Sequence, residues 1–384
     1  MAIFKNRKKS NSRYIKLFGK VVYMTSARIR TKKQWFLGGL FSVFKTNEFD
    51  HSITKRYYFL NRLVLRENIS SRKRSFYVND ELVYTKDLTK SFVRKYNKYF
   101  KNYDDILILN ANSGEIYLFL TYVLKAFLRK HNAKKVLFMT DKQYHIDLIN
   151  MICPEISSCK VKRLPVFKDK LVEIADKRFY MLFTKNHFLH VEDTIKKDSS
   201  GKAHYFEMLL EELGLTTAEI EFTPMQIPDD VKDSLLEKIS KTGLNLDNFV
   251  FITPEAYSCE ECSNDFWKNI ITDAKSKGYD VYANVTNPDN SIEGAEYKTC
   301  DLSFAEAIAL AGMSKKIVSL RSGLTECLLQ CNVPMEVIYT PFKQRYIFND
   351  MSVEKVMTGF GLEEIPNVDR ENVCEFKADG FGKK

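Results

Sequence analysis

The stretch Asp105-Ile-Leu-Ile-Leu-Asn110, followed by Ala111-Asn-Ser-Gly-Glu115, decides the fold class of this chain. Four consecutive aliphatic residues between polar ends indicate a buried β-strand, and the glycine-containing loop leads into a long helix with an apolar face, Ile116 to Lys130. A second strand is expected at Lys135 to Thr140. Strands and helices that alternate at this spacing predict an α/β protein with a parallel, doubly wound sheet.

The same alternation continues and then starts again further along the chain. We expect further strands of the first sheet at 161–166 and 179–183, an amphipathic helix at Tyr205 to Leu213, and an interdomain linker in the proline-punctuated segment Thr223 to Asp230. The second sheet is expected to contain Asn248–Thr253, Tyr279–Ala283, Lys316–Leu320 and Met335–Tyr339. The sequence therefore predicts two Rossmann-like domains facing a cleft, at 101–230 and 231–345, and a short C-terminal tail, 346–384.

Length and charge support this division and add a third part. A chain of 384 residues exceeds the size at which one hydrophobic core keeps growing. Its net charge of +10 is unevenly spread, because residues 1–100 hold 24 Lys and Arg against 6 Asp and Glu, which leaves −8 for the other 284 residues. A basic end on an otherwise mildly acidic protein points to a polyanionic partner for that end alone, either nucleic acid or anionic lipid.

The first hundred residues contain a degenerate repeat of aromatic-rich runs interrupted by Gly or Asn. Such units are typical of β-hairpins, because Gly and Asn adopt turn conformations while aromatic and β-branched residues favour strands. The four runs are Tyr14–Tyr23, Trp35–Phe44, Tyr58–Leu65 and Phe76–Tyr84. Aromatic rings beside cations suit an anionic membrane surface. The alternative is a basic strand layer packed on the main body. We expect 1–100 to be a basic, β-rich N-terminal extension.

Several other classes of protein are disfavoured. No run reaches the roughly 18 apolar residues of a membrane span, and the first apolar run, Trp35 to Phe44, is too late and too short for a signal peptide. We expect a cytoplasmic protein, peripheral on the inner face of the membrane, whose eight cysteines are reduced thiols. Cys259 and Cys262 have zinc-like spacing, but no second closely spaced Cys or His pair complements them.

In open α/β sheets, ligands bind at the carboxyl ends of the strands, so the loops after strands are the places to look for a site. The first such loop contains Asn112, Ser113 and Gly114, and Gly114 would let the backbone approach a ligand closely. Glu115 follows at the start of a helix, where a carboxylate is favoured and could act as a general base. The simpler interpretation of Glu115 is a helix-start acid without a chemical role.

Two later loops carry phosphate-binding features. Ser258 follows the strand that ends at Thr253, and its hydroxyl and the nearby N–H groups could hold phosphate oxygens. The third loop runs from a strand straight into a helix and offers a guanidinium, hydroxyls and backbone N–H groups to one anion. Its candidate residues are Arg321, Ser322, Gly323, Thr325 and Glu326. Glu326 could accept hydrogen bonds from sugar hydroxyls, or it could be an exposed helix charge.

No metal site is expected. The histidines His187, His190 and His204 are scattered and lack metal-ligand spacing, and no Asp-x-Asp pair stands in a loop that follows a strand. A metal-dependent reaction is therefore disfavoured, and no cofactor is predicted.

Taken in order, these loops resemble the ADP-heptose:lipopolysaccharide heptosyltransferase family and related transferases of capsule and lipopolysaccharide gene clusters. The family's opening strand, Gly-Asp and helix correspond to Gly114-Glu115 here. The motifs that match in its second half are Pro254-Glu-Ala256, Phe266-Trp267, Leu302-Ser303 with Glu306, and Arg321-Ser322-Gly323 with Glu326. The family has Asp, Asp and His where this chain has Glu115, Arg321 and Glu326. The resemblance covers about residues 104–342.

The resemblance implies a GT-B glycosyltransferase that uses a nucleotide sugar and a glycan or lipid-linked glycan acceptor. Glu115 would be the general base of an inverting reaction without metal. The diphosphate would be neutralised by Ser258, Arg321, Ser322, Gly323 and Thr325, and Glu326 would orient the donor. The acceptor would be contacted by Asn112, Ser113, Gly114 and His204.

Two other functions remain open on the sequence. A polyanion- or nucleic-acid-binding protein would explain the basic N-terminal extension, although no familiar nucleic-acid motif is present and we do not expect a nucleic-acid partner. A phosphotransferase-type enzyme of the same polysaccharide clusters would share the fold and transfer a different group.

Overall fold

The computed structural model describes most of the chain. The described residues are 4–9, 12–17, 20–27, 31–37, 40–47, 53–60, 62–69, 73–87, 89–162, 164, 171–174, 176–182, 204–257, 259–287, 291–341, 353–362, 365–369 and 371–378. The chain forms two compact units, Met1–Ile108 with Arg163–Asn186 and Leu109–Lys162 with His187–Lys384. This division does not coincide with the boundaries predicted at 100 and 230.

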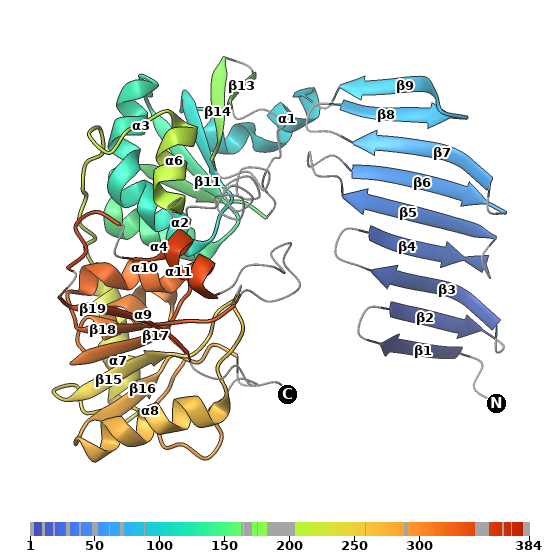
Figure 1. Cartoon of the computed structure of the whole chain (residues 1–384). Helices are drawn as coiled ribbons and strands as arrows, with labels where there is room; N and C mark the ends of the chain where they lie inside the picture. The colour runs from blue at the N-terminus through green and yellow to red at the C-terminus, as the bar shows by residue number, and fades with distance from the viewer. Residues whose placement is uncertain are drawn as a thin grey trace. The chain divides into compact units, whose positions relative to one another are not determined.

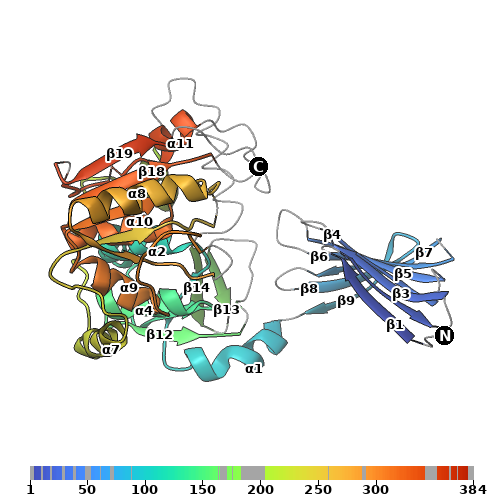
Figure 2. The ribbon, with the colours of Figure 1, turned by 90° about the horizontal axis from the view of Figure 1, so that it is seen from below.

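The first unit is built around one antiparallel sheet of nine strands, whose spatial order follows the chain from β1 to β9 (Figure 1). Their bounds are β1 Phe4–Lys9, β2 Ser12–Leu17, β3 Lys20–Ala27, β4 Thr31–Phe36, β5 Phe41–Asn47, β6 Ile53–Phe59, β7 Arg62–Ile69, β8 Lys73–Val78 and β9 Glu81–Asp87. The four predicted hairpins are confirmed as the pairs β2–β3, β4–β5, β6–β7 and β8–β9. Figure 2 shows the twist of these strands.

The same unit contains helix α1 (Thr89–Phe100) and three further strands, β10 (Asp105–Leu109), β13 (Leu171–Ile174) and β14 (Lys177–Leu182). Arg178 forms an ion pair with the fully buried Asp105 at 2.6 Å, and the rings of Phe100 and Phe179 meet edge to face. β13 and β14 are antiparallel, because the link between them is too short for the crossover that parallel strands need. The expectation of a parallel sheet after Asp104 was therefore wrong at the edge that β13 forms.

The second sheet has the order β12-β11-β10-β14-β13, with β11 (Val136–Thr140) and β12 (Ser157–Lys160) parallel. Of the strand predicted at 161–166, the described residues Val161, Lys162 and Leu164 are not in a strand, and β12 ends at Lys160. Residues 163, 165 and 166 lie outside the described residues. Helices α4 (Gln143–Ile152), α6 (Tyr205–Leu213) and α7 (Asp229–Ser240) belong to the second unit.

The helix predicted at Ile116–Lys130 is present as three consecutive pieces. These are α2 (Ser113–Leu118), a π-helical turn (Phe119–Val123) and α3 (Leu124–Lys130). All five residues of the π turn are buried, as are Ile116, Tyr117 and Leu118 of α2. The helix that begins with Ser113, Gly114 and Glu115 is therefore embedded in the core on most of its surface.

The third sheet is wholly parallel, in the order β16-β15-β17-β18-β19. Its strands are β15 Phe249–Thr253, β16 Asp280–Ala283, β17 Lys316–Leu320, β18 Met335–Tyr339 and β19 Val373–Lys377, and the helices that follow them in the chain are α8 Asn264–Ser276, α9 Phe304–Ala311, α10 Gly323–Leu328 and α11 Val353–Phe360. The first four strands confirm the prediction. The fifth was missed, because β19 lies in the predicted tail, 346–384, yet pairs with β18 from Met335↔Val373 onward.

Helix α8 covers one face of the third sheet (Figure 2). Its residues Trp267, Ile271 and Ala274 are buried in one apolar cluster with Val250 of β15 and Val281 of β16. Burying a large apolar side chain of this kind stabilises a fold by about 1.5–3 kcal/mol.

In the described part of the chain, no helix has the length and apolar character needed to cross a bilayer.

Candidate functional site

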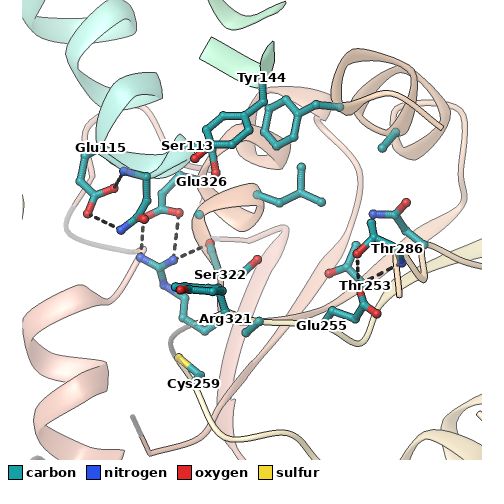
Figure 3. Close-up of a pocket in the computed structure, with 18 of the residues that line it drawn as sticks. Ser113, Glu115, Tyr144, Thr253, Glu255, Cys259, Thr286, Arg321, Ser322 and Glu326 are labelled. Atoms are coloured by element: carbon teal, nitrogen blue, oxygen red, sulfur yellow. Dashed lines mark hydrogen bonds and ion pairs between the residues drawn. The ribbon is translucent and has the colours of Figure 1, made fainter. Parts of the chain in front are cut away.

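A cavity of about 880 Å³ opens in the second unit, among segments that follow β10, β11, β15, β16 and β17 (Figure 3). The ends of these parallel strands are where the sequence placed the site. Seven of the predicted site residues line the cavity: Asn112, Ser113, Glu115, Arg321, Ser322, Gly323 and Glu326. Residues more than 200 positions apart in the chain are thus brought to one site.

Two helix starts, those of α2 and α10, meet beside the cavity because two glycines allow it. A Cβ atom at Gly114 would lie 2.5 Å from a carboxylate oxygen of Glu326, closer than real Cβ atoms come. Gly323 leaves no room for a side chain either, because Ser113 lies against it. Gly114, predicted as an acceptor contact, therefore serves first as the place where α10 approaches α2.

Glu115 stands in the first turn of α2. Its carboxylate accepts hydrogen bonds from the backbone N–H of Asn112 at 3.1 Å and from the Asn112 side chain at 3.3 Å, which fixes its orientation toward the helix start. Burial, and then the nearby Glu326 carboxylate, raise the pKa of Glu115 above its usual value. The helix-start role and the role of a proton acceptor are thus compatible, since a carboxylate with a raised pKa takes up a proton more readily.

Arg321 and Glu326 form a buried ion pair in the wall of the cavity. The guanidinium Nη2 lies 2.6 Å from Oε1 and Nη1 lies 2.9 Å from Oε2, while the two side chains are only 7% and 5% exposed. Arg321 also donates to the carbonyl oxygens of Ser322 and Phe360, and Tyr205 donates to Glu326 at 2.9 Å. Most of the donors of Arg321 are thus occupied by protein acceptors. Its predicted contact with a diphosphate remains a prediction.

Thr325 does not line the cavity. It is fully buried, and its hydroxyl accepts from the Ser322 N–H at 2.9 Å and contacts the Ser319 hydroxyl at 3.0 Å. Ser319 in turn accepts from Thr253 at 2.7 Å. This chain of hydroxyls ties the ends of β15 and β17 to the start of α10, so Thr325 shapes the loop that the sequence assigned to the donor.

His204 also lies outside the cavity lining. Its Nδ1 accepts from the Phe206 N–H at the start of α6, and its Nε2 lies 2.8 Å from the carbonyl oxygen of Gly361. Both ring nitrogens are therefore used by the backbone, which is the contact pattern of a structural histidine rather than of an acceptor ligand. Ser258, the remaining donor candidate, lies outside the described residues.

Other cavity residues were not found from the sequence. Lys142, in the loop after β11, lines the cavity, and its Nζ lies 3.5 Å from the carbonyl oxygen of Ala111. Tyr144 and Phe304 also line it, with ring centroids 5.6 Å apart. Lys142 and Tyr144 follow a strand, which is the signal that could have found them. Phe304 begins α9, inside the Leu302-Ser303 motif that was noted for another reason.

Glu255 shapes the far side of the cavity (Figure 3). Its carboxylate accepts from the backbone N–H groups of Thr286 and Asn287 at 3.0 and 3.1 Å, and from the Thr286 hydroxyl. One side chain thereby holds together the loops that follow β15 and β16. Three donors on one carboxylate indicate a structural role for Glu255.

The cysteine pair shows no metal-binding arrangement. Cys259 is buried at the cavity and Cys262 is half-buried, both as free thiols, and burial raises the pKa of Cys262 to about 12. Across the described ranges, no three His, Cys, Asp or Glu side chains gather as a metal site would require.

No protein-family model and no curated protein sequence matches the chain. Solved structures do show similarity. A glycosyl transferase family 9 structure from Veillonella parvula has 11% identity and a TM-score of 0.43, covering 72% of this chain and 88% of that one. The Escherichia coli heptosyltransferase WaaC with ADP has 9% identity and a TM-score of 0.40, covering 72% and 93%. The heptosyltransferase TibC with ADP-D-β-D-heptose has 14% identity and a TM-score of 0.39, covering 80% and 75%. The loop motifs resemble the same family.

Proposed function

We propose that this protein is a glycosyltransferase that moves a sugar from a nucleotide-sugar donor to a surface polysaccharide, lipopolysaccharide or lipid-linked acceptor. The observation that carries the proposal is the position of Glu115, a carboxylate with a raised pKa that lines a cavity of about 880 Å³ at the carboxyl ends of parallel strands. A cavity of this size accommodates a nucleotide sugar. The sequence motifs of the three loops support the same class of enzyme.

In the proposed reaction, the Glu115 carboxylate takes the proton of the acceptor hydroxyl. The acceptor oxygen bonds to the anomeric carbon of the donor sugar from one side. The bond from that carbon to the diphosphate oxygen breaks on the other side, and the configuration inverts. The nucleoside diphosphate leaves with the electron pair, and Glu115 keeps the proton. The proposal includes no metal, in keeping with the sequence, which lacks an Asp-x-Asp pair in a loop after a strand.

The leaving diphosphate would meet the loop of Ser322 and Gly323 and the ammonium group of Lys142, all of which line the cavity. Positioned donors and cations of this kind stabilise charge that develops on a leaving group. Tyr144 and Phe304 supply an apolar wall on which a sugar or nucleobase ring could pack.

We place the enzyme in the cytoplasm, on the inner face of the membrane, with residues 1–100 facing anionic lipid.

The first test is a thermal-shift screen of the whole protein against UDP, GDP, CMP, ADP and dTDP, with and without magnesium. A ligand that binds only the folded state raises its stability in proportion to the logarithm of ligand concentration. We expect one nucleotide to raise Tm selectively. The rise in Tm should be the same with and without magnesium. Transfer from the corresponding nucleotide sugar should then fail with Glu115→Gln. The proposal fails if none of the five nucleotides stabilises the protein.

A further inference from the structure

At one end of its strands, the nine-stranded sheet carries exposed apolar side chains. Successive turns of a meander alternate between the two ends of the strands, so the β4–β5 and β6–β7 turns lie at the same end. They are also neighbours, because the Leu60 N–H donates to the Leu40 carbonyl at 2.8 Å and the Phe41 and Phe59 rings are 4.9 Å apart. We call the exposed apolar side chains at this end of the strands the apolar edge: Phe36, Leu37, Leu40, Phe41, Phe59 and Leu60.

The two leucines at the turn tips occupy a conformation that leucine disfavours. Leu37 and Leu60 both have φ of 48°, in the left-handed region where Gly and Asn are preferred. Gly38 and Asn61 stand at the next positions in the sequence, so suitable turn residues are close by. Leu37 is 65% exposed and Leu60 is 59% exposed. Packing among the residues that the structure describes does not account for an exposed leucine at each strained tip, whereas an external apolar partner does.

Behind the apolar edge, the strand register orders the side chains in rows. The row next to the apolar edge consists of Trp35, Ser42 and Tyr58, in which Trp35 pairs with Ser42 and Ser42 with Tyr58. On β7, the exposed Arg62 stands opposite Phe59 at the edge itself. On β4, β5 and β6 the cations begin three residues from the edge and continue in the next row, about 10–13 Å away at the usual rise of a strand. These two cation rows consist of Lys33, Arg56 and Arg66, and then Lys32, Lys45 and Lys55.

The cation rows place like charges directly opposite one another. Lys45 pairs with Lys32 on one side and with Lys55 on the other, and Arg56 pairs with Arg66. Like charges in opposed positions destabilise a sheet. Lys55 forms an ion pair with Glu67 at 3.4 Å, and Arg66 forms one with Asp80 at 2.8 Å. Among the described residues, the other four cations of the two rows have no ion pair. An external anion would remove this repulsion.

We propose that this end of the sheet docks on an anionic lipid bilayer, with the apolar edge inserted below the headgroups. Trp35 and Tyr58 then lie at headgroup level, where such rings are enriched, and the two cation rows face lipid phosphates. An insertion of about 5–10 Å is usual for interfacial elements. A nucleic acid would use the cations but would leave the leucine tips unexplained. The inference rests on the anionic-lipid part of the proposed function and not on its transfer chemistry.

The test is co-sedimentation of the whole protein with vesicles of phosphatidylcholine alone or mixed with phosphatidylglycerol, without nucleotide. Leu37→Asn with Leu60→Asn removes the apolar tips and installs a residue that favours the same φ, so the sheet should fold unchanged, as a melting curve will show. The matched control is Leu236→Asn, an exposed leucine of α7. We expect wild type and the control to bind the anionic vesicles at least tenfold better than neutral ones, and the double variant to lose tenfold or more.

Equal binding by the double variant and wild type would overturn the proposal, as would wild-type protein that ignores anionic vesicles. A concentration-dependent dimer that the double variant loses, without vesicle binding in wild type, would assign the edge to a second copy of the chain instead. Transfer to a soluble acceptor is assayed without vesicles, so a failure of the glycosyltransferase proposal is distinguishable from a failure of this one.

Discussion

Gly323 lies directly against Ser113: a Cβ atom at Gly323 would stand 2.6 Å from the Ser113 hydroxyl oxygen and 2.9 Å from the Gly114 amide nitrogen. The second of these atoms belongs to the backbone and cannot turn aside. The separation of the α2 and α10 starts, and with it the shape of the cavity, therefore depends on the absence of a side chain at this position.

Gly323→Ala should destabilise the protein by about 1–3 kcal/mol, the usual cost of forcing atoms into a packed site. It should also reduce transfer, because it moves Ser113 and Glu115 relative to the α10 loop. Chemical denaturation and a transfer assay measure the two effects. The matched control is Gly312→Ala, where the new Cβ meets the nearest atom at an ordinary 3.5 Å. An equal response of the two variants would contradict this account.

Glu115→Gln should lower kcat by about 10²–10⁴-fold, the usual contribution of a general base. Burial and the Glu326 carboxylate raise the pKa of Glu115. The wild-type rate should therefore fall on the acid side at a pH above 4.5, as Glu115 becomes protonated and can no longer accept a proton. A pH profile of kcat/KM checks this. Glu237→Gln, on the exposed face of α7, should leave both the rate and the profile unchanged.

Arg321→Met should cost about 3–5 kcal/mol of stability, because it leaves the buried Glu326 carboxylate without its partner. The double variant Arg321→Met with Glu326→Leu should recover much of that loss, since two apolar side chains leave no unpaired charge. Denaturant unfolding of the wild type, both single variants and the double variant forms a complete cycle. If the double variant is as unstable as the sum of the singles, the pair is not coupled.

Glu306 should make stability depend on pH. Burial acts to raise the pKa of Glu306, but hydrogen bonds from Lys238, Ser303 and Ser234 outweigh it and lower the pKa to about 2. Because the folded-state pKa is lowered, its stabilisation is present above about pH 4.5 and is lost as pH falls toward 2. Allowing for the partly exposed Lys238, we expect a loss of about 2 kcal/mol across this window.

The measurement is urea unfolding at several pH values between 2 and 7. Glu306→Gln should be less stable at pH 7 and should show a shallower decline toward acid. A decline as steep as that of the wild type would show that other carboxylates are responsible.

Lys142→Met should raise KM for the nucleotide sugar about tenfold, with a smaller change in kcat, because it removes a cation that faces the cavity and keeps the length of the side chain. Nucleotide titrations should show the same loss of affinity. Lys277→Met, which removes an exposed lysine paired with Asp273 on α8, is the control. Unchanged donor affinity in Lys142→Met would place the diphosphate elsewhere in the cavity.

The sequence predicted the strands of the third sheet and the four hairpins because their signals are local. Runs such as Phe249–Ile252 are apolar throughout, and each hairpin has Gly or Asn between strand-forming residues. It missed β19 because Val373–Lys377 is short and half-polar, and its place in the sheet comes from pairing with β18. It placed a strand at 161–166 on three apolar residues, Val161, Leu164 and Val166, although Pro165 has no N–H for a sheet ladder.

The site was predicted in outline for a similar reason. Loops after strands can be found in a sequence, so Glu115 and Ser322 were expected near a ligand, and both line the cavity. The ion pair between Arg321 and Glu326 could not be foreseen, because it depends on how the loop before α10 directs Arg321 toward the first turn of that helix. Tyr205, which donates to the same carboxylate, comes from a distant part of the chain. The same limit hid the pairing of Tyr144 with Phe304, which lie 160 positions apart.

In the first sheet, every strand pairs only with the strands before and after it in the chain. No strand depends on a distant partner, so removing or adding one hairpin leaves the register of every other pair unchanged. Neighbouring strands lie about 4.8 Å apart, so each hairpin changes the breadth of the sheet by about 10 Å. The width of this surface is thus a modular quantity, which insertions and deletions can adjust in fixed steps while the cavity-bearing unit keeps its sequence.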